Sequence, residues 1–115
     1  MQPITVSTTD ASGGTTYSRS VRMDSWANAQ TIIQVNVTGT ATYTVETSMD
    51  DPNSPTNPVA AASMVWVNCA DTAVVAKTAS AQGVVVAKPK FICIKKTEGA
   101  GSTTMTLAQF GNAPY

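Results

Sequence analysis

The stretch TIIQVNVTGTATYTVETS, residues 31 to 48, decides the fold class. Apolar and polar side chains alternate on both sides of its single glycine, with Ile33, Val35 and Val37 before it and Ala41, Tyr43 and Val45 after it. Such alternation predicts β-strands that each bury one face. Gly39 follows Thr38 at the centre, where a tight turn needs a positive φ that glycine adopts easily. We therefore predict a β-hairpin over these residues.

Weaker alternation predicts further short strands along the rest of the chain. They are ITVSTT (4–9), YSRSVRM (17–23), SMVWVN (63–68), TAVVAKT (72–78), GVVVA (83–87), KFICIKKT (90–97) and TTMTLAQF (103–110). We expect the last two to form a second hairpin. Leucine occurs once, whereas Thr and Val dominate, and β-branched residues suit a pleated sheet. About eight short strands predict an all-β fold, a single antiparallel β-sandwich of jelly-roll or immunoglobulin-like type.

Length and charge limit the domain organisation and the class of partner. We expect the 115 residues to form one domain, 1–115, with an extended N-terminal arm over about residues 1–16 and a short tail over 112–115. Charged residues make up 12% of the chain, and the net charge is 0. No long-range field therefore favours nucleic acid or an anionic membrane, and weak self-repulsion favours association. Because we find neither a signal segment nor a membrane-spanning apolar run, we expect the chain to be made in the cytoplasm.

The chain offers little for catalysis. It contains no histidine, and its two cysteines, Cys69 and Cys93, form no CxxC pair. Histidine-based catalytic sites and cysteine or histidine zinc sites are therefore excluded, and we expect free thiols. We expect no catalytic residue and no cofactor.

The segment DDPNSPTNPVAAAS, residues 50–63, connects two predicted strands and is unusually long for such a connection. Adjacent carboxylates at Asp50 and Asp51 could hold a hard cation such as calcium. They lack the dense spacing of a calcium-binding loop, so we favour a turn in which their side chains accept backbone amide hydrogens ahead of Pro52. Three prolines, Pro52, Pro55 and Pro58, predict a stiff, extended course.

Aromatic and basic side chains allow two further interpretations each. The aromatic residues Tyr17, Trp26, Tyr43 and Trp66 could line a sugar-binding face, although Tyr43 and Trp66 fit a core position better because they alternate with apolar neighbours. The lysines are Lys88, Lys90, Lys95 and Lys96, which could bind phosphate but are better explained as a solvated strand edge.

Four segments occur in an order that resembles a known group of proteins. They are TGTATYTVETSMDDPNSP (38–55), MVWVN (64–68), KTASAQG (77–83) and TEGAGSTTMTLAQFG (97–111). Together they resemble small proteins encoded among the structural genes of tailed bacteriophages, over a region from about Asp24 to Gly111. The chain departs from that pattern at residues 92–96, where an arginine is expected, and at an extra Ala60–Ala62.

The resemblance implies a function as well as a fold. It implies a non-enzymatic virion protein on the capsid surface, made in the host cytoplasm, that decorates or cements the shell by binding the major capsid protein as a homo-oligomer. A trimer is the expected oligomer, with a dimer as the alternative. Subunit or capsid contacts are expected at Pro3, Ile4, Trp26, Asp50, Asp51, Pro52, Pro55 and Tyr115. The alternative function is a virion-surface adhesin or carbohydrate-binding module of a head fibre or tail, with Trp26 and loop aromatics in its binding face.

Overall fold

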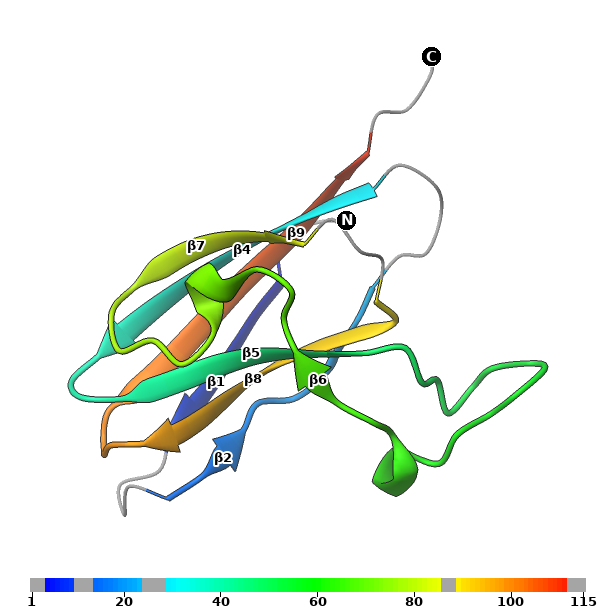
Figure 1. Ribbon diagram of the computed structural model, residues 1–115, viewed down its shortest axis with the longest axis horizontal. Helices are drawn as coiled ribbons and strands as arrows, with labels where there is room; N and C mark the ends of the chain where they lie inside the picture. Colours follow the sequence, from blue (N-terminus) through cyan, green and yellow to red (C-terminus); the bar gives the residue numbers. More distant parts are fainter. Residues whose placement is uncertain (1–3, 10–13, 24–28, 86–88, 112–115) are drawn as a thin grey trace.

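The computed structural model describes residues 4–9, 14–23, 29–85 and 89–111, and this part of the chain is all-β. Two antiparallel sheets of four and five strands pack together (Figure 1). Sheet A has the order β1 (Ile4–Thr9), β9 (Ser102–Gly111), β4 (Ala29–Thr38), β7 (Ala81–Val85). Sheet B has the order β2 (Thr16–Tyr17), β8 (Phe91–Glu98), β5 (Thr42–Ser48), β6 (Val67–Asn68), and β3 (Val21–Arg22) also pairs with β8. The prediction of an antiparallel all-β sandwich is confirmed.

Both predicted hairpins are wrong in their pairing. β4 pairs with β9 in sheet A, whereas β5 pairs with β8 in sheet B. The chain therefore crosses between the sheets at each predicted turn, once after Thr38 and once after Glu98, and both crossings lie at the same end of the sandwich (Figure 1). Alternation did not reveal this, because two amphipathic strands bury the same residues whether they lie side by side or face each other.

The two crossings, residues 39–41 and 99–101, pack directly against each other. The backbone N–H of Gly101 donates to the carbonyl oxygen of Thr40 at 2.8 Å. A Cβ atom on Gly101 would lie 2.7 Å from the backbone nitrogen of Thr40 and would also collide with the carbonyl oxygen of Thr38. A Cβ atom on Gly99, which has φ +91°, would likewise collide with the backbone carbonyl of Thr40. Glycine at 99 and 101 thus lets the two backbones approach closely.

The core lies between the sheets and takes side chains from both. Ile33 and Val35 of β4 face Val45 of β5 and Ile94 of β8 across the interior, and all four are fully buried. One lysine contradicts the predicted solvated edge: Lys96 is fully buried, and its Nζ donates to the carbonyl oxygens of Gly99 and Gly14. Burial of an ammonium group demands such partners.

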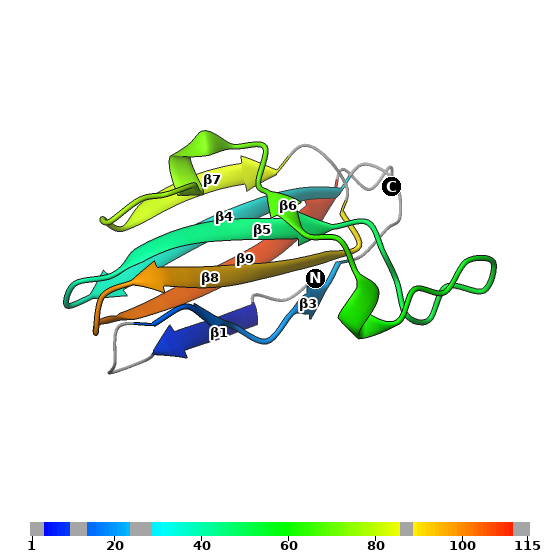
Figure 2. The ribbon, with the colours of Figure 1, turned by 60° about the horizontal axis from the view of Figure 1, so that its bottom comes forward.

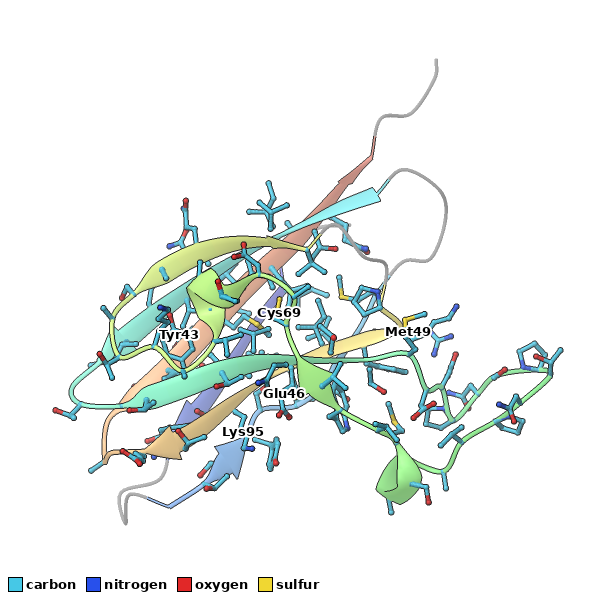
Figure 3. The ribbon with its side chains drawn as sticks, in the orientation of Figure 1. Tyr43, Glu46, Met49, Cys69 and Lys95 are labelled. Atoms are coloured by element: carbon cyan, nitrogen blue, oxygen red, sulfur yellow. The ribbon has the colours of Figure 1, made fainter. Side chains whose placement is uncertain are left out.

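The segment after β6 closes one side of the sandwich. Its predicted strand, 72–78, is wrong, because residues Thr72–Val74 form the short 3-10 helix η2. Asp71 caps this helix through Ala73 N–H at 3.0 Å and also accepts from Val84 N–H of β7 at 2.9 Å. The fully buried Tyr43 of β5 donates its hydroxyl to the Ala79 carbonyl at 2.8 Å (Figure 3). The segment thereby ties β7, at the edge of sheet A, to β5 of sheet B.

Other elements differ from the predictions in extent. The predicted strand over residues 17–23 is two short strands, β2 and β3, and the predicted strand over residues 63–68 is reduced to β6, which follows the 3-10 helix η1 (Ala61–Ser63). The strand predicted over residues Ile4–Thr9, within the extended N-terminal arm, is confirmed as β1, and it pairs with β9. Within the described ranges, no helix is long and apolar enough to cross a membrane.

Candidate functional site

The connection between β5 and β6, residues 49–66, extends beyond one end of the sandwich and is called here the projecting loop. Figures 1 and 2 both show it reaching past the strands of the two sheets, with η1 on its returning arm. It contains the acidic, proline-rich stretch, and Met49 at its root is 66% exposed (Figure 3). The site is therefore built on a loop that a rigid scaffold positions.

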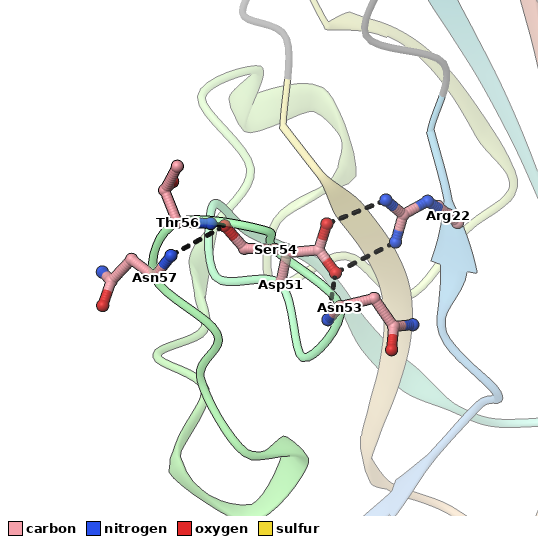
Figure 4. A network of polar contacts seen from close by, with 6 residues as sticks. All are labelled: Arg22, Asp51, Asn53, Ser54, Thr56 and Asn57. Carbon is pink, nitrogen blue, oxygen red and sulfur yellow. Dashed lines mark hydrogen bonds and ion pairs between the residues drawn. The ribbon is translucent and has the colours of Figure 1, made fainter.

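An ion pair holds the loop to the sandwich. Arg22 of β3 donates from both terminal nitrogens to Asp51, at 3.0 Å to Oδ1 and 2.8 Å to Oδ2 (Figure 4). The Asp51 side chain is 8% exposed and that of Arg22 is 54% exposed. Two parallel hydrogen bonds of this kind fix geometry better than a single contact does. The pair joins strand and loop across 29 residues of sequence.

Asp51 also organises the turn that follows it. Its Oδ1 accepts the N–H of Asn53 at 2.9 Å, and its carbonyl oxygen accepts from Ser54 N–H at 3.2 Å and Val59 N–H at 3.1 Å. The Ser54 hydroxyl oxygen in turn accepts the N–H of Asn57 at 3.1 Å (Figure 4). The loop therefore closes on itself by local bonds.

Asp50 ties the outgoing and returning arms of the loop together. Its Oδ2 accepts the N–H of Val65 at 2.6 Å, and its own N–H donates to the Ser48 hydroxyl at 3.1 Å. The prediction that Asp50 and Asp51 accept amide hydrogens is confirmed. The two carboxylates act on different parts of the loop, although they are adjacent in sequence.

The electrostatics of the site favour the ionised form of Asp51. The hydrogen bonds from Arg22 and from the Asn53 amide lower the pKa of the Asp51 carboxyl. The hydrogen bond to Asp51 in turn raises the pKa of Arg22. Among the described residues, no group of three or more acidic, cysteine or histidine side chains could hold a metal ion. Both Asp51 oxygens are already engaged by Arg22.

A pocket of about 320 Å³ lies between the projecting loop and the end of sheet B. Its lining includes Arg22 and Lys90 from the sandwich and Asp50, Asp51 and Pro55 from the loop. Charges of both signs balance there. The lining holds no thiol or histidine.

The structure places the remaining predicted contact residues unevenly. Pro55 is exposed at the loop tip and Pro52 is partly buried beside Asp51. Ile4 begins β1, partly buried and opposite Leu107. Pro3, Trp26 and Tyr115 fall outside the described residues.

The other candidate side chains lie apart from this site. Cys69 and Cys93 are buried free thiols, as predicted, and burial raises the pKa of the Cys93 thiol to about 12. Tyr17 is 55% exposed on β2, where the Lys95 ammonium lies 5.6 Å from its ring centre. The Lys95 Nζ also lies 3.8 Å from Glu46 Oε2 (Figure 3).

Sequence reasoning missed Arg22 as the partner of the acidic pair. It gave no reason to connect an arginine in a short strand with a loop 29 residues later. Asp50 and Asp51 are two adjacent negative charges with no basic residue beside them in the sequence, in a chain with few charges. That is the one signal that could have prompted a search for a cationic partner.

Comparisons of the chain with family models, with curated proteins and with solved structures found no match.

Proposed function

We propose that the chain is a non-enzymatic structural protein of a tailed-phage virion. It binds the major capsid protein as a homo-oligomer and decorates the outside of the shell. Its sandwich would be of the jelly-roll or immunoglobulin-like type. The segment order described above motivates the proposal, and the pre-organised projecting loop is the structural observation that carries it.

The projecting loop has the form that a contact with a shell requires. Its tip is open to solvent at Pro55, Thr56, Asn57 and Pro58. Its base is fixed by the Arg22–Asp51 pair and by Asp50. A loop that is already ordered loses less conformational entropy on binding, so more of the contact energy remains as affinity.

The chemistry of the described residues agrees with a binding role. Both thiols are buried, both loop carboxylates accept hydrogen bonds, and Ser54 uses its hydroxyl to close the turn. These groups stabilise the fold and the loop. A decorating protein needs a rigid scaffold and an exposed contact surface, and this arrangement supplies both.

The test is binding to shells of the phage that encodes the chain. Purified protein is mixed with shells lacking it, the shells are pelleted, and occupancy is measured for wild type, Arg22→Ala and the control Arg19→Ala. Both arginines are exposed, but only Arg22 holds the loop. We expect saturable binding by wild type and Arg19→Ala and at least threefold weaker binding by Arg22→Ala, which is about 0.7 kcal/mol.

A glycan array separates the two candidate functions. Specific sugar binding by the isolated chain, together with no binding to shells, would replace the decoration role with the adhesin role. Shell binding that Arg22→Ala leaves unchanged would keep the decoration role and remove the projecting loop from its contact surface.

A further inference from the structure

The charges of the molecule are distributed unevenly between the two sheets. No Asp, Glu, Lys or Arg occurs in the four strands of sheet A, β1, β4, β7 and β9. The charged residues within the described ranges all lie in sheet B or in connecting segments: Arg19, Arg22, Glu46, Asp50, Asp51, Asp71, Lys77, Lys90, Lys95, Lys96 and Glu98. One whole layer of the sandwich is therefore uncharged.

The outward side of sheet A carries hydroxyl and amide groups in register. Thr5 and Thr106 lie opposite each other with their hydroxyl oxygens 3.1 Å apart, and the Gln82 side-chain amide donates to Gln34 Oε1 at 3.5 Å. The end of the face is aliphatic, because Ile32 is 39% and Val84 is 44% exposed. These two residues are register partners. We call this outward side of sheet A the uncharged face.

We propose that the uncharged face binds the same face of a second copy of the chain, about a two-fold axis. In such a contact each residue near the axis meets its own copy. Hydroxyl and carboxamide groups both donate and accept hydrogen bonds, so identical groups can pair across the axis. Charged residues would instead oppose like charges, which is costly. The composition of this face is therefore complementary to itself.

The size of the face fits a reversible dimer. Four strands at about 4.8 Å spacing and about eight residues at about 3.3 Å each give roughly 500 Å² in projection. Two copies would then bury about 1,000 Å², close to the lower limit for a specific interface. The exposed pair Ile32 and Val84 supplies the apolar part of that area.

The β7 edge of sheet A is blocked to strand addition at one point, which favours contact through the face. The N–H of Val84 donates to the Asp71 carboxylate instead of to a further strand. A carboxylate in that position also opposes the close approach of another backbone carbonyl. Growth of the sheet at β7 is thus disfavoured, whereas the uncharged face is open.

With this contact, the homo-oligomer of the proposed function is a dimer, which is the alternative to the expected trimer. It rests on the proposed function only for its biological use, because self-association is measured on the isolated chain without shells. Failure to dimerise would leave shell binding untouched, and failure to bind shells would leave the dimer untouched.

Sedimentation velocity on the full chain, from about 1 μM to about 1 mM, tests the contact directly. We expect a monomer–dimer equilibrium for wild type. Gln34→Lys and Asn36→Lys, both on the uncharged face, should weaken it at least tenfold. The control is Asn68→Lys, a change at an exposed strand asparagine of sheet B, which should leave it unchanged.

Urea unfolding of each variant shows that the fold is retained. A chain that stays monomeric, or that forms a trimer, would overturn the proposal. Dimerisation that neither lysine on the face weakens would also overturn it, and would direct attention to another surface such as the edge of β1.

Discussion

Replacing Gly101 with alanine tests the packing of the two sheet crossings. Gly101 lies against the other crossing, and its N–H donates to Thr40 at 2.8 Å. An added Cβ would lie 2.7 Å from the Thr40 nitrogen and collide with the Thr38 carbonyl. Because backbone atoms cannot rotate away as a side chain can, the two crossings must separate.

The expected loss of stability has two parts. Forcing an extra carbon into a packed site costs about 1 to 3 kcal/mol, and loss of the Gly101–Thr40 hydrogen bond adds about 1 kcal/mol. We therefore expect Gly101→Ala to lower the free energy of unfolding by about 2 to 4 kcal/mol. At about 4 °C per kcal/mol for a domain of this size, Tm should fall by roughly 8 to 16 °C.

Gly39→Ala is the matched control, since it changes the other crossing. Gly39 has φ +77°, but an added Cβ would meet its nearest neighbour, Gly101 Cα, at 3.3 Å. Its cost is mainly that of the left-handed conformation, about 1 to 2 kcal/mol. Urea unfolding followed by circular dichroism measures both variants. In a pair of simple hairpins Gly39 would be the sensitive residue and Gly101 would tolerate alanine. A loss below about 0.5 kcal/mol for Gly101→Ala would therefore show that the two crossings are not packed tightly against each other.

Two further predictions concern ionisation. The lowered pKa of Asp51 means that its carboxylate stabilises the loop above the unfolded-state value of about 3.9 and that this support is lost as pH falls through the lower folded value. Hydrogen exchange at the Asn53 amide should therefore accelerate toward acid pH, beyond the intrinsic trend, in wild type and not in Asp51→Asn; equal pH profiles would contradict it. The Cys93 thiol, with its pKa raised to about 12, should resist a thiol reagent at pH 8 until the chain unfolds. The protonated Cys93 thiol contributes stability below about pH 8.5, and this contribution declines above that value. Rapid labelling of Cys93 in the native protein, measured in a Cys69→Ser background, would contradict the prediction because it would show that the thiol is open to solvent.

Alternation located most strands but could not assign their partners. The burial of Ile33, Val35 and Val45 agrees with the predicted inward faces. Pairing depends on contacts between distant segments, such as β4 with β9, and local pattern carries no information about them. The segment 72–78 looked like a strand because of Val74 and Val75, yet Asp71 caps a short helix there and Val74 fills the core.

The candidate site could be predicted only in its local part. That Asp50 and Asp51 accept amide hydrogens follows from the chemistry of Asp-Asp-Pro turns, and the structure confirms it. The Arg22 partner depends on where β3 lies beside the loop, which the sequence does not indicate. Neighbouring lysines led to the prediction that Lys96 lies at an exposed edge. The structure instead buries Lys96, and the carbonyl oxygens of Gly14 and Gly99 accept hydrogen bonds from its ammonium.

An electron-microscopy map of the virion tests the proposed function most directly. We expect density for this sandwich on the outer surface of the capsid, with the projecting loop against the major capsid protein. Density for the chain at the tail tip, or a complete virion map without it, would contradict the decoration role.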